Sequence, residues 1–115
     1  MRSSGKLILD AGCGSGFTSL CLAEANPEAK IIGIDISEES LKLARERLKY
    51  HGFPNVEFHC LFLEELPTLG MEFDYINAHE LLSILPDVPG ALQCMKMVLK
   101  PEGIVRTNIH SYFQR

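Results

Sequence analysis

Short apolar runs recur along the chain, and several of them are nearly continuous. They cover residues 6–10, 30–35, 56–60, 72–78 and 103–109. Continuous apolar runs of this length are typical of parallel strands, because both faces of such a strand are buried. The pattern therefore predicts five strands that belong to one mainly parallel sheet.

Segments with helical spacing separate these runs. In the first, Phe17, Leu20, Cys21 and Glu24 follow the period of a helix, which should stop before Pro27. We therefore expect these four side chains to share one helix face.

Two further helices are predicted from their end signals. One should lie between Ser37 as its N-cap and Gly52 just beyond its end, and another between Asp87 and Pro101. The inner face of the last helix would consist of Leu92, Met95, Val98 and Leu99. Because strands and helices alternate, we expect right-handed βαβ units in a three-layer, Rossmann-like α/β domain.

Composition and charge set the class of protein. With 115 residues, 46% of them apolar and 23% charged, the chain has the makeup of a single globular domain over residues 1–115. The net charge of -4 argues against nucleic-acid binding. No apolar run approaches the length of a membrane span, and no signal-peptide region precedes the first strand, so we expect a cytoplasmic protein. The cysteines lie too far apart for a zinc site.

A glycine-rich stretch, ILDAGCGSG at residues 8–16, follows the first strand directly. Glycines at such a junction let the backbone approach a ligand, whose polar groups then meet free N–H groups of the next helix. The second strand ends at Asp35, where a carboxylate can accept hydrogen bonds from both hydroxyls of a ribose. Together the two features predict a cofactor that contains adenosine.

The glycine spacing helps to identify that cofactor. A dinucleotide fingerprint has the form GxGxxG, but Phe17 stands where its third glycine should be. Asp10, just before the loop, would repel a pyrophosphate and attract the ammonium of an amino-acid moiety. An NAD(P)-dependent oxidoreductase therefore stays the less favoured alternative.

The sequence resembles the class I S-adenosylmethionine-dependent methyltransferases in five ordered motifs. They are ILDAGCGSG, IIGIDIS, NVEFHC leading to EELP, FDYINAHELLSILPD and LKPEGIV, and they cover residues 7–109. The resemblance implies S-adenosylmethionine as cofactor and a sheet with the strand order 3-2-1-4-5. The family's strands 6 and 7 would be absent, so the domain is expected to be incomplete.

The resemblance also implies roles for residues at the carboxyl ends of the strands. Asp35 would hold the ribose, Ile36 would pack on the adenine, and His79 would face the methionine end and the substrate. The methionine portion would lie against Asp10, Gly12, Cys13, Gly14 and Gly16.

Phe62 departs from the family pattern, because many members have at this position an acid that receives the adenine amino group. We expect Phe62 or Leu63 to stack on the ring, and a backbone N–H there could reach an adenine nitrogen. Glu64 and Glu65 are expected to serve the start of a helix.

The predicted reaction is methyl transfer by in-line displacement to a small-molecule or protein acceptor. His79 is the candidate catalytic base, with a cap or a pocket wall as its other interpretation. Two further hypotheses are a non-catalytic module that binds S-adenosylmethionine and a truncated fragment. The open edge of the fifth strand favours a homodimer.

Overall fold

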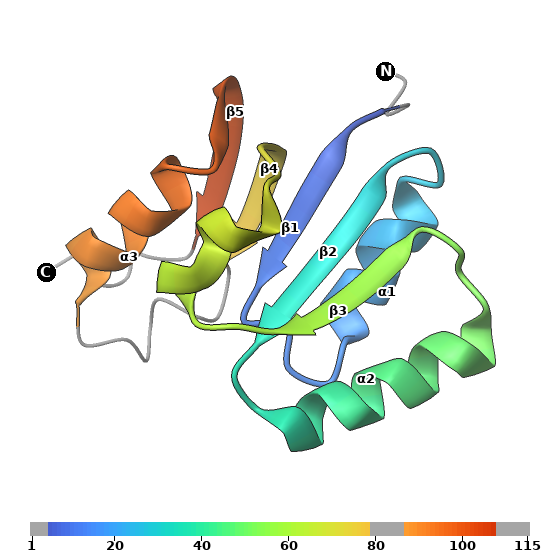
Figure 1. Cartoon of the computed structure of the whole chain (residues 1–115). Coiled ribbons are helices and arrows are strands. Elements are labelled where there is room, and N and C mark those ends of the chain that lie inside the picture. The colour runs from blue at the N-terminus through green and yellow to red at the C-terminus, as the bar shows by residue number, and fades with distance from the viewer. Residues whose placement is uncertain (1–4, 79–86, 108–115) are drawn as a thin grey trace, which may run out of the picture.

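The protein contains a five-stranded parallel sheet in a computed structural model that describes residues 5–78 and 87–107. The strands are β1 (Leu7–Ala11), β2 (Lys30–Asp35), β3 (Val56–Cys60), β4 (Phe73–Ala78) and β5 (Leu99–Thr107). Their order in the sheet is β3-β2-β1-β4-β5, and every neighbouring pair is parallel (Figure 1). The predicted strand order is confirmed.

Helices cover both faces of this sheet (Figure 1). They are α1 (Phe17–Ala25), α2 (Glu38–His51), the 3-10 helix η1 (Leu63–Leu69) and α3 (Val88–Lys96). α1 and α2 pack on one face, whereas η1 and α3 pack on the other. The predicted three-layer α/β architecture is therefore confirmed. Within the described residues, no helix has the length and apolar character to cross a bilayer.

Alternate residues of the central strands β1 and β2 belong to different core clusters. Ile31 packs with the α1 and α2 side, whereas Ile32 packs with the η1 and α3 side, and both are fully buried. Period-two alternation sends successive side chains to opposite faces, so a strand covered on both sides is apolar throughout. This explains why β1 and β2 are nearly continuous apolar runs, whereas β3 alternates buried and exposed residues.

The predicted end signals of α2 and the predicted N-cap of α3 are confirmed. The Ser37 hydroxyl accepts the N–H of Ser40, and Gly52 takes the left-handed conformation after α2. The Asp87 carboxylate accepts the N–H of Gly90 at the start of α3. These contacts satisfy backbone groups that a helix leaves unpaired at its ends.

The predicted inner face of the last helix is wrong in part. α3 ends at Lys96, so Val98 and Leu99 lie outside it, and Pro101 belongs to β5. The N–H of Phe73 donates to the Val98 carbonyl, and Leu99 pairs with Phe73. Strand pairing with β4 thus overrides helical spacing, and a strand paired on one side tolerates proline.

The predicted face of α1 is also wrong in part. Leu20 is buried, but Phe17 is 70% exposed, and Cys21 and Glu24 are exposed too. The buried face consists of Ser19, Leu20 and Ala23. Small residues let α1 approach the sheet closely, and a helix only nine residues long gives a weak periodic signal.

Candidate functional site

The glycine loop joins the carboxyl end of β1 to the start of α1. The N–H groups of Gly12 and Cys13 both donate to the Ile34 carbonyl, at 2.9 and 2.8 Å. The N–H of Gly16 donates to the Cys13 carbonyl at 2.9 Å. The loop is thus tied to the end of β2 and turned tightly on itself.

The loop requires glycine at positions 14 and 16 for different structural reasons. Gly14 has a φ of 55°, and a Cβ built there would meet nothing within 4 Å. Gly16 has a φ of 88°, and its Cβ would lie 2.8 Å from the Ala44 Cβ and 3.1 Å from the Phe58 ring. Gly14 therefore leaves open space beside the loop, whereas Gly16 allows the loop to pack against α2 and β3.

Asp35 connects this loop to the start of α2. Its Oδ2 accepts the N–H of Gly14 at 2.8 Å, and its Oδ1 accepts the N–H of Ser37 at 2.9 Å. An ionised carboxylate offers about four lone-pair sites, so Asp35 keeps acceptor capacity beyond these two bonds. The structure thus brings Asp35 and the glycine loop together, as the spacing predicts.

Asp10 lies beneath the loop and is only 2% exposed. Ser19 Oγ donates to its Oδ2 at 2.6 Å, and Asn77 Nδ2 donates to its Oδ1 at 3.1 Å. Burial raises the pKa of Asp10, while these two hydrogen bonds oppose that rise. Ser19 and Asn77 were not among the predicted site residues. The available sequence signals were a polar residue, Ser19, within a short helix and a polar residue, Asn77, near the end of a largely apolar strand.

Cys13 is buried next to these acids. Burial, with Asp10 and Asp35 nearby, raises the pKa of its thiol to about 12. The thiol is therefore neutral at physiological pH and is a poor nucleophile. Cys13 can line a ligand through its backbone and small side chain, but it does not supply reactive chemistry.

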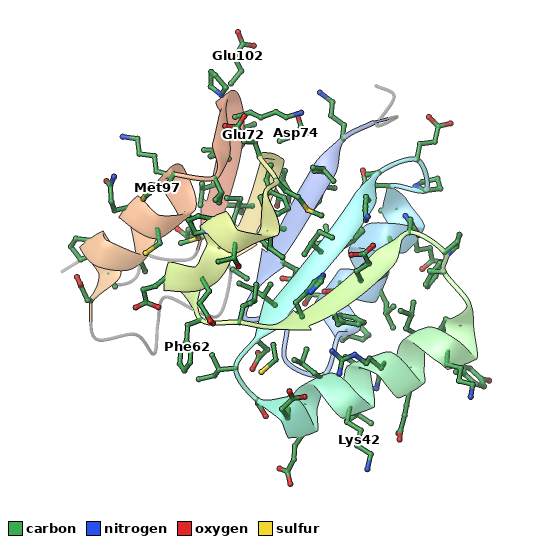
Figure 2. The ribbon with its side chains drawn as sticks, in the orientation of Figure 1. Lys42, Phe62, Glu72, Asp74, Met97 and Glu102 are labelled. Carbon is green, nitrogen blue, oxygen red and sulfur yellow. The ribbon has the colours of Figure 1, made fainter. Side chains whose placement is uncertain are left out.

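Two large apolar side chains are exposed where β2 and β3 end. Ile36 is 61% and Phe62 59% exposed, and Figure 2 shows Phe62 projecting outward from the segment after β3. The two strand ends are neighbours, since Asp35 pairs with Cys60. Exposed apolar side chains at the carboxyl edge of an open α/β sheet fit an aromatic ligand.

The other residues after β3 have structural contacts. Leu63 packs partly buried against the core on the η1 side. The N–H of Phe62 donates to Glu65 Oε1 at 2.8 Å, which confirms that Glu65 serves the helix start. The predicted contact of a backbone N–H with an adenine nitrogen stays a prediction, and at Phe62 it would require that N–H to exchange Glu65 for the ligand.

The catalytic candidate His79 lies outside the described residues. In the described ranges, 5–78 and 87–107, no group of three or more His, Cys, Asp or Glu side chains could hold a metal ion. Among the described residues, the candidate site consists of the glycine loop, Asp10, Asp35, Ile36 and Phe62 along the carboxyl edge of β1, β2 and β3.

Comparison with known protein families identifies the family to which this sequence is similar. Residues 2–113 match the methyltransferase domain family. The chain is 38% identical over 101 residues to the demethylmenaquinone methyltransferase of Geobacillus stearothermophilus, covering 87% of this chain and 43% of that protein. It is 35% identical over 105 residues to the ubiquinone biosynthesis O-methyltransferase of Bordetella avium, covering 88% and 41%. The chain thus spans less than half the length of these relatives.

Solved structures agree with this match. PKMT2 from Rickettsia typhi, in complex with AdoHcy, has a TM-score of 0.80 and 29% identity over 89% of this chain and 20% of that one. The [4+2]-cyclase SpnF has a TM-score of 0.82 and 30% identity over 90% of this chain and 38% of that one. One fold therefore carries more than one activity among these neighbours.

Proposed function

Because the chain belongs to the class I S-adenosylmethionine-dependent methyltransferases, we propose that it is the cofactor-binding part of such an enzyme. The observation that carries the proposal is the hydrogen bond from the Gly14 N–H to the Asp35 carboxylate. It places a carboxylate that can accept ribose hydroxyls beside an open glycine turn. A cofactor with a ribose and an amino-acid tail would contact both. Bound there, S-adenosylmethionine supplies a methyl group on a positively charged sulfur for in-line displacement.

Each candidate residue has a role in this proposal. Asp35 accepts hydrogen bonds from the ribose hydroxyls, while Ile36 and Phe62 contact the adenine. Leu63 is the weaker candidate for the ring, because its side chain packs partly into the core. The methionine portion lies against Gly12, Cys13, Gly14 and Gly16, with Asp10 beneath. His79 stays the predicted catalytic base.

The described residues fit such a cofactor in three respects. Asp35 keeps unused acceptor sites, the space beside Gly14 is open, and Ile36 and Phe62 are exposed. Each respect matches one part of the cofactor, namely its ribose, its amino-acid tail and its base. A nicotinamide dinucleotide would instead place two phosphates above the buried acid Asp10.

The acceptor is proposed to be a small molecule in preference to a protein. By their names, one of the two relatives is a demethylmenaquinone methyltransferase and the other a ubiquinone biosynthesis O-methyltransferase, which favours a small organic acceptor. The net charge of -4 opposes a nucleic-acid acceptor, since phosphates are bound through clusters of basic residues.

Calorimetric titration with S-adenosylhomocysteine and, separately, NADH tests the cofactor assignment. We expect S-adenosylhomocysteine to bind with a dissociation constant on the order of micromolar, or about -8 kcal/mol, and NADH not to bind. Binding of NADH alone would favour the oxidoreductase. No binding by a folded chain would support the truncated fragment, and cofactor binding without any methylation would support the non-catalytic module.

Association of two chains through β5 is a further part of the proposal. Among the strands that the structure describes, β5 lies at one end of the order, and Ile104 on it is 61% exposed. An unpaired strand edge can pair with another chain. We expect sedimentation velocity to show a dimer at concentrations on the order of 100 micromolar, and a monomer throughout would contradict the homodimer.

A further inference from the structure

The cluster formed by Asp10, Ser19 and Asn77 is the most deeply buried polar group of the site. Ser19 is fully buried, Asp10 is 2% exposed and Asn77 8%. They come from β1, α1 and β4, three elements that converge below the glycine loop. Burying polar groups destabilises a fold unless they form hydrogen bonds. Apolar side chains would avoid that cost, so the presence of these three polar residues calls for a further reason.

The packing around Ser19 directs its hydroxyl toward Asp10. In the sheet, Asp10 pairs with Gly33 on β2 and with Asn77 on β4. A Cβ at Gly33 would lie 2.9 Å from Ser19 Oγ and 2.8 Å from the Phe58 ring. The missing side chain of Gly33 therefore provides the space that Ser19 occupies. The Ser19 hydroxyl thus donates to Oδ2 of Asp10, and the Asn77 amide donates to Oδ1.

The charges that face this cluster make the two hydrogen bonds important. In the part of the chain that the structure describes, Asp10 has no cationic partner. Its charged or titratable neighbours are Asp35 and Cys13, and Arg45 acts on Cys13. Burial and Asp35 both raise the pKa of Asp10, whereas Ser19 and Asn77 lower it. The two donors are thus what favours the ionised carboxylate.

We infer that Ser19 and Asn77 are positioning residues that hold Asp10 ionised beneath the loop, where its charge attracts the cationic methionine end of the cofactor. The inference rests on the proposed function, because it requires a ligand with positive charge over the loop. In the water-poor surroundings of Asp10, an unscreened charge acts on such a ligand without direct contact. Cofactor affinity should therefore weaken as Asp10 becomes protonated.

The test measures S-adenosylhomocysteine affinity by calorimetry at about pH 6 and about pH 8 for the wild type, Ser19→Ala and Asn77→Ala. Without one donor, Asp10 protonates at higher pH, so the loss should concentrate at the lower pH. We expect Ser19→Ala to bind about tenfold more weakly at the lower pH and nearly as well as wild type at the higher one. Asn77→Ala should change affinity in the same direction. Thr18→Ala removes an exposed hydroxyl from the same helix and is the matched control, expected to follow the wild type at both pH values.

Two results would overturn the inference. One is a Ser19→Ala profile that equals the wild type, and the other is an equal loss at both pH values, which indicates a purely structural role. Failure of the wild type to bind S-adenosylhomocysteine would instead contradict the proposed function. In that case, a carbon-13 NMR titration of the Asp10 carboxyl in the free chain still decides whether Ser19 and Asn77 lower its pKa.

Discussion

Asp35→Ala is expected to weaken S-adenosylhomocysteine binding by about 100-fold or more. The substitution removes the acceptor for the ribose hydroxyls. It also releases the N–H groups of Gly14 and Ser37, which the carboxylate accepts at 2.8 and 2.9 Å. The ligand would thus lose direct hydrogen bonds and the loop conformation that presents Gly14. Calorimetric titration measures the change.

Asp74→Ala is the matched control for this loss. Asp74 also accepts a backbone N–H, that of Leu7 at 2.8 Å, and lies near Lys6 and Lys100. Leu7 is the first residue of β1 and Asp74 the second of β4, so this contact lies at the amino end of the sheet, away from Phe62 (Figure 2). Asp74→Ala should lower the free energy of unfolding by about 1 kcal/mol and leave binding unchanged. Equal binding by wild type and Asp35→Ala would contradict the assignment of Asp35 to the ribose.

The sequence was sufficient to predict the sheet because its signals are local. β1 and β2 are short, nearly continuous apolar runs, the glycine loop follows the first of them, and Asp35 ends the second. The carboxyl ends of parallel strands share one edge, so residues that follow different strands meet there. The meeting of Gly14 with Asp35, 21 residues apart, follows from this geometry.

The parts that sequence reasoning missed depend on contacts between distant segments. The Ser19 hydroxyl of α1 reaches Asp10 where Gly33 on β2 lacks a side chain, and Asn77 meets Asp10 across 67 positions. The boundary between α3 and β5 was misplaced because the apolar spacing of Val98 and Leu99 fits a helix as well as a strand. Pairing with Phe73 decides between them, and no local pattern encodes that pairing.

Gly16→Ala is expected to lower the free energy of unfolding by about 2 to 4 kcal/mol. Its new Cβ would lie 2.8 Å from the Ala44 Cβ and 3.1 Å from the Phe58 ring, and the φ of 88° is unfavourable for alanine. Ala44 is fully buried in α2, so relief would require a shift of that helix. Urea unfolding monitored by circular dichroism measures the loss.

Gly52→Ala is the matched control for Gly16→Ala, because it changes the free energy of unfolding through the backbone conformation without a steric clash. Gly52 has a φ of 74°, but its Cβ would meet nothing within 4 Å, so we expect a loss of only about 1 kcal/mol. Gly14→Ala, with the same open surroundings, should be similarly mild for stability and yet prevent S-adenosylhomocysteine binding. Equal losses for Gly16→Ala and Gly52→Ala would show that Ala44 and Phe58 yield to the new side chain. A larger loss of stability for Gly16→Ala, together with lost binding by a stable Gly14→Ala, would show that two glycines of one loop have separate functions, because Gly16 closes the loop on the core and Gly14 opens it to the ligand.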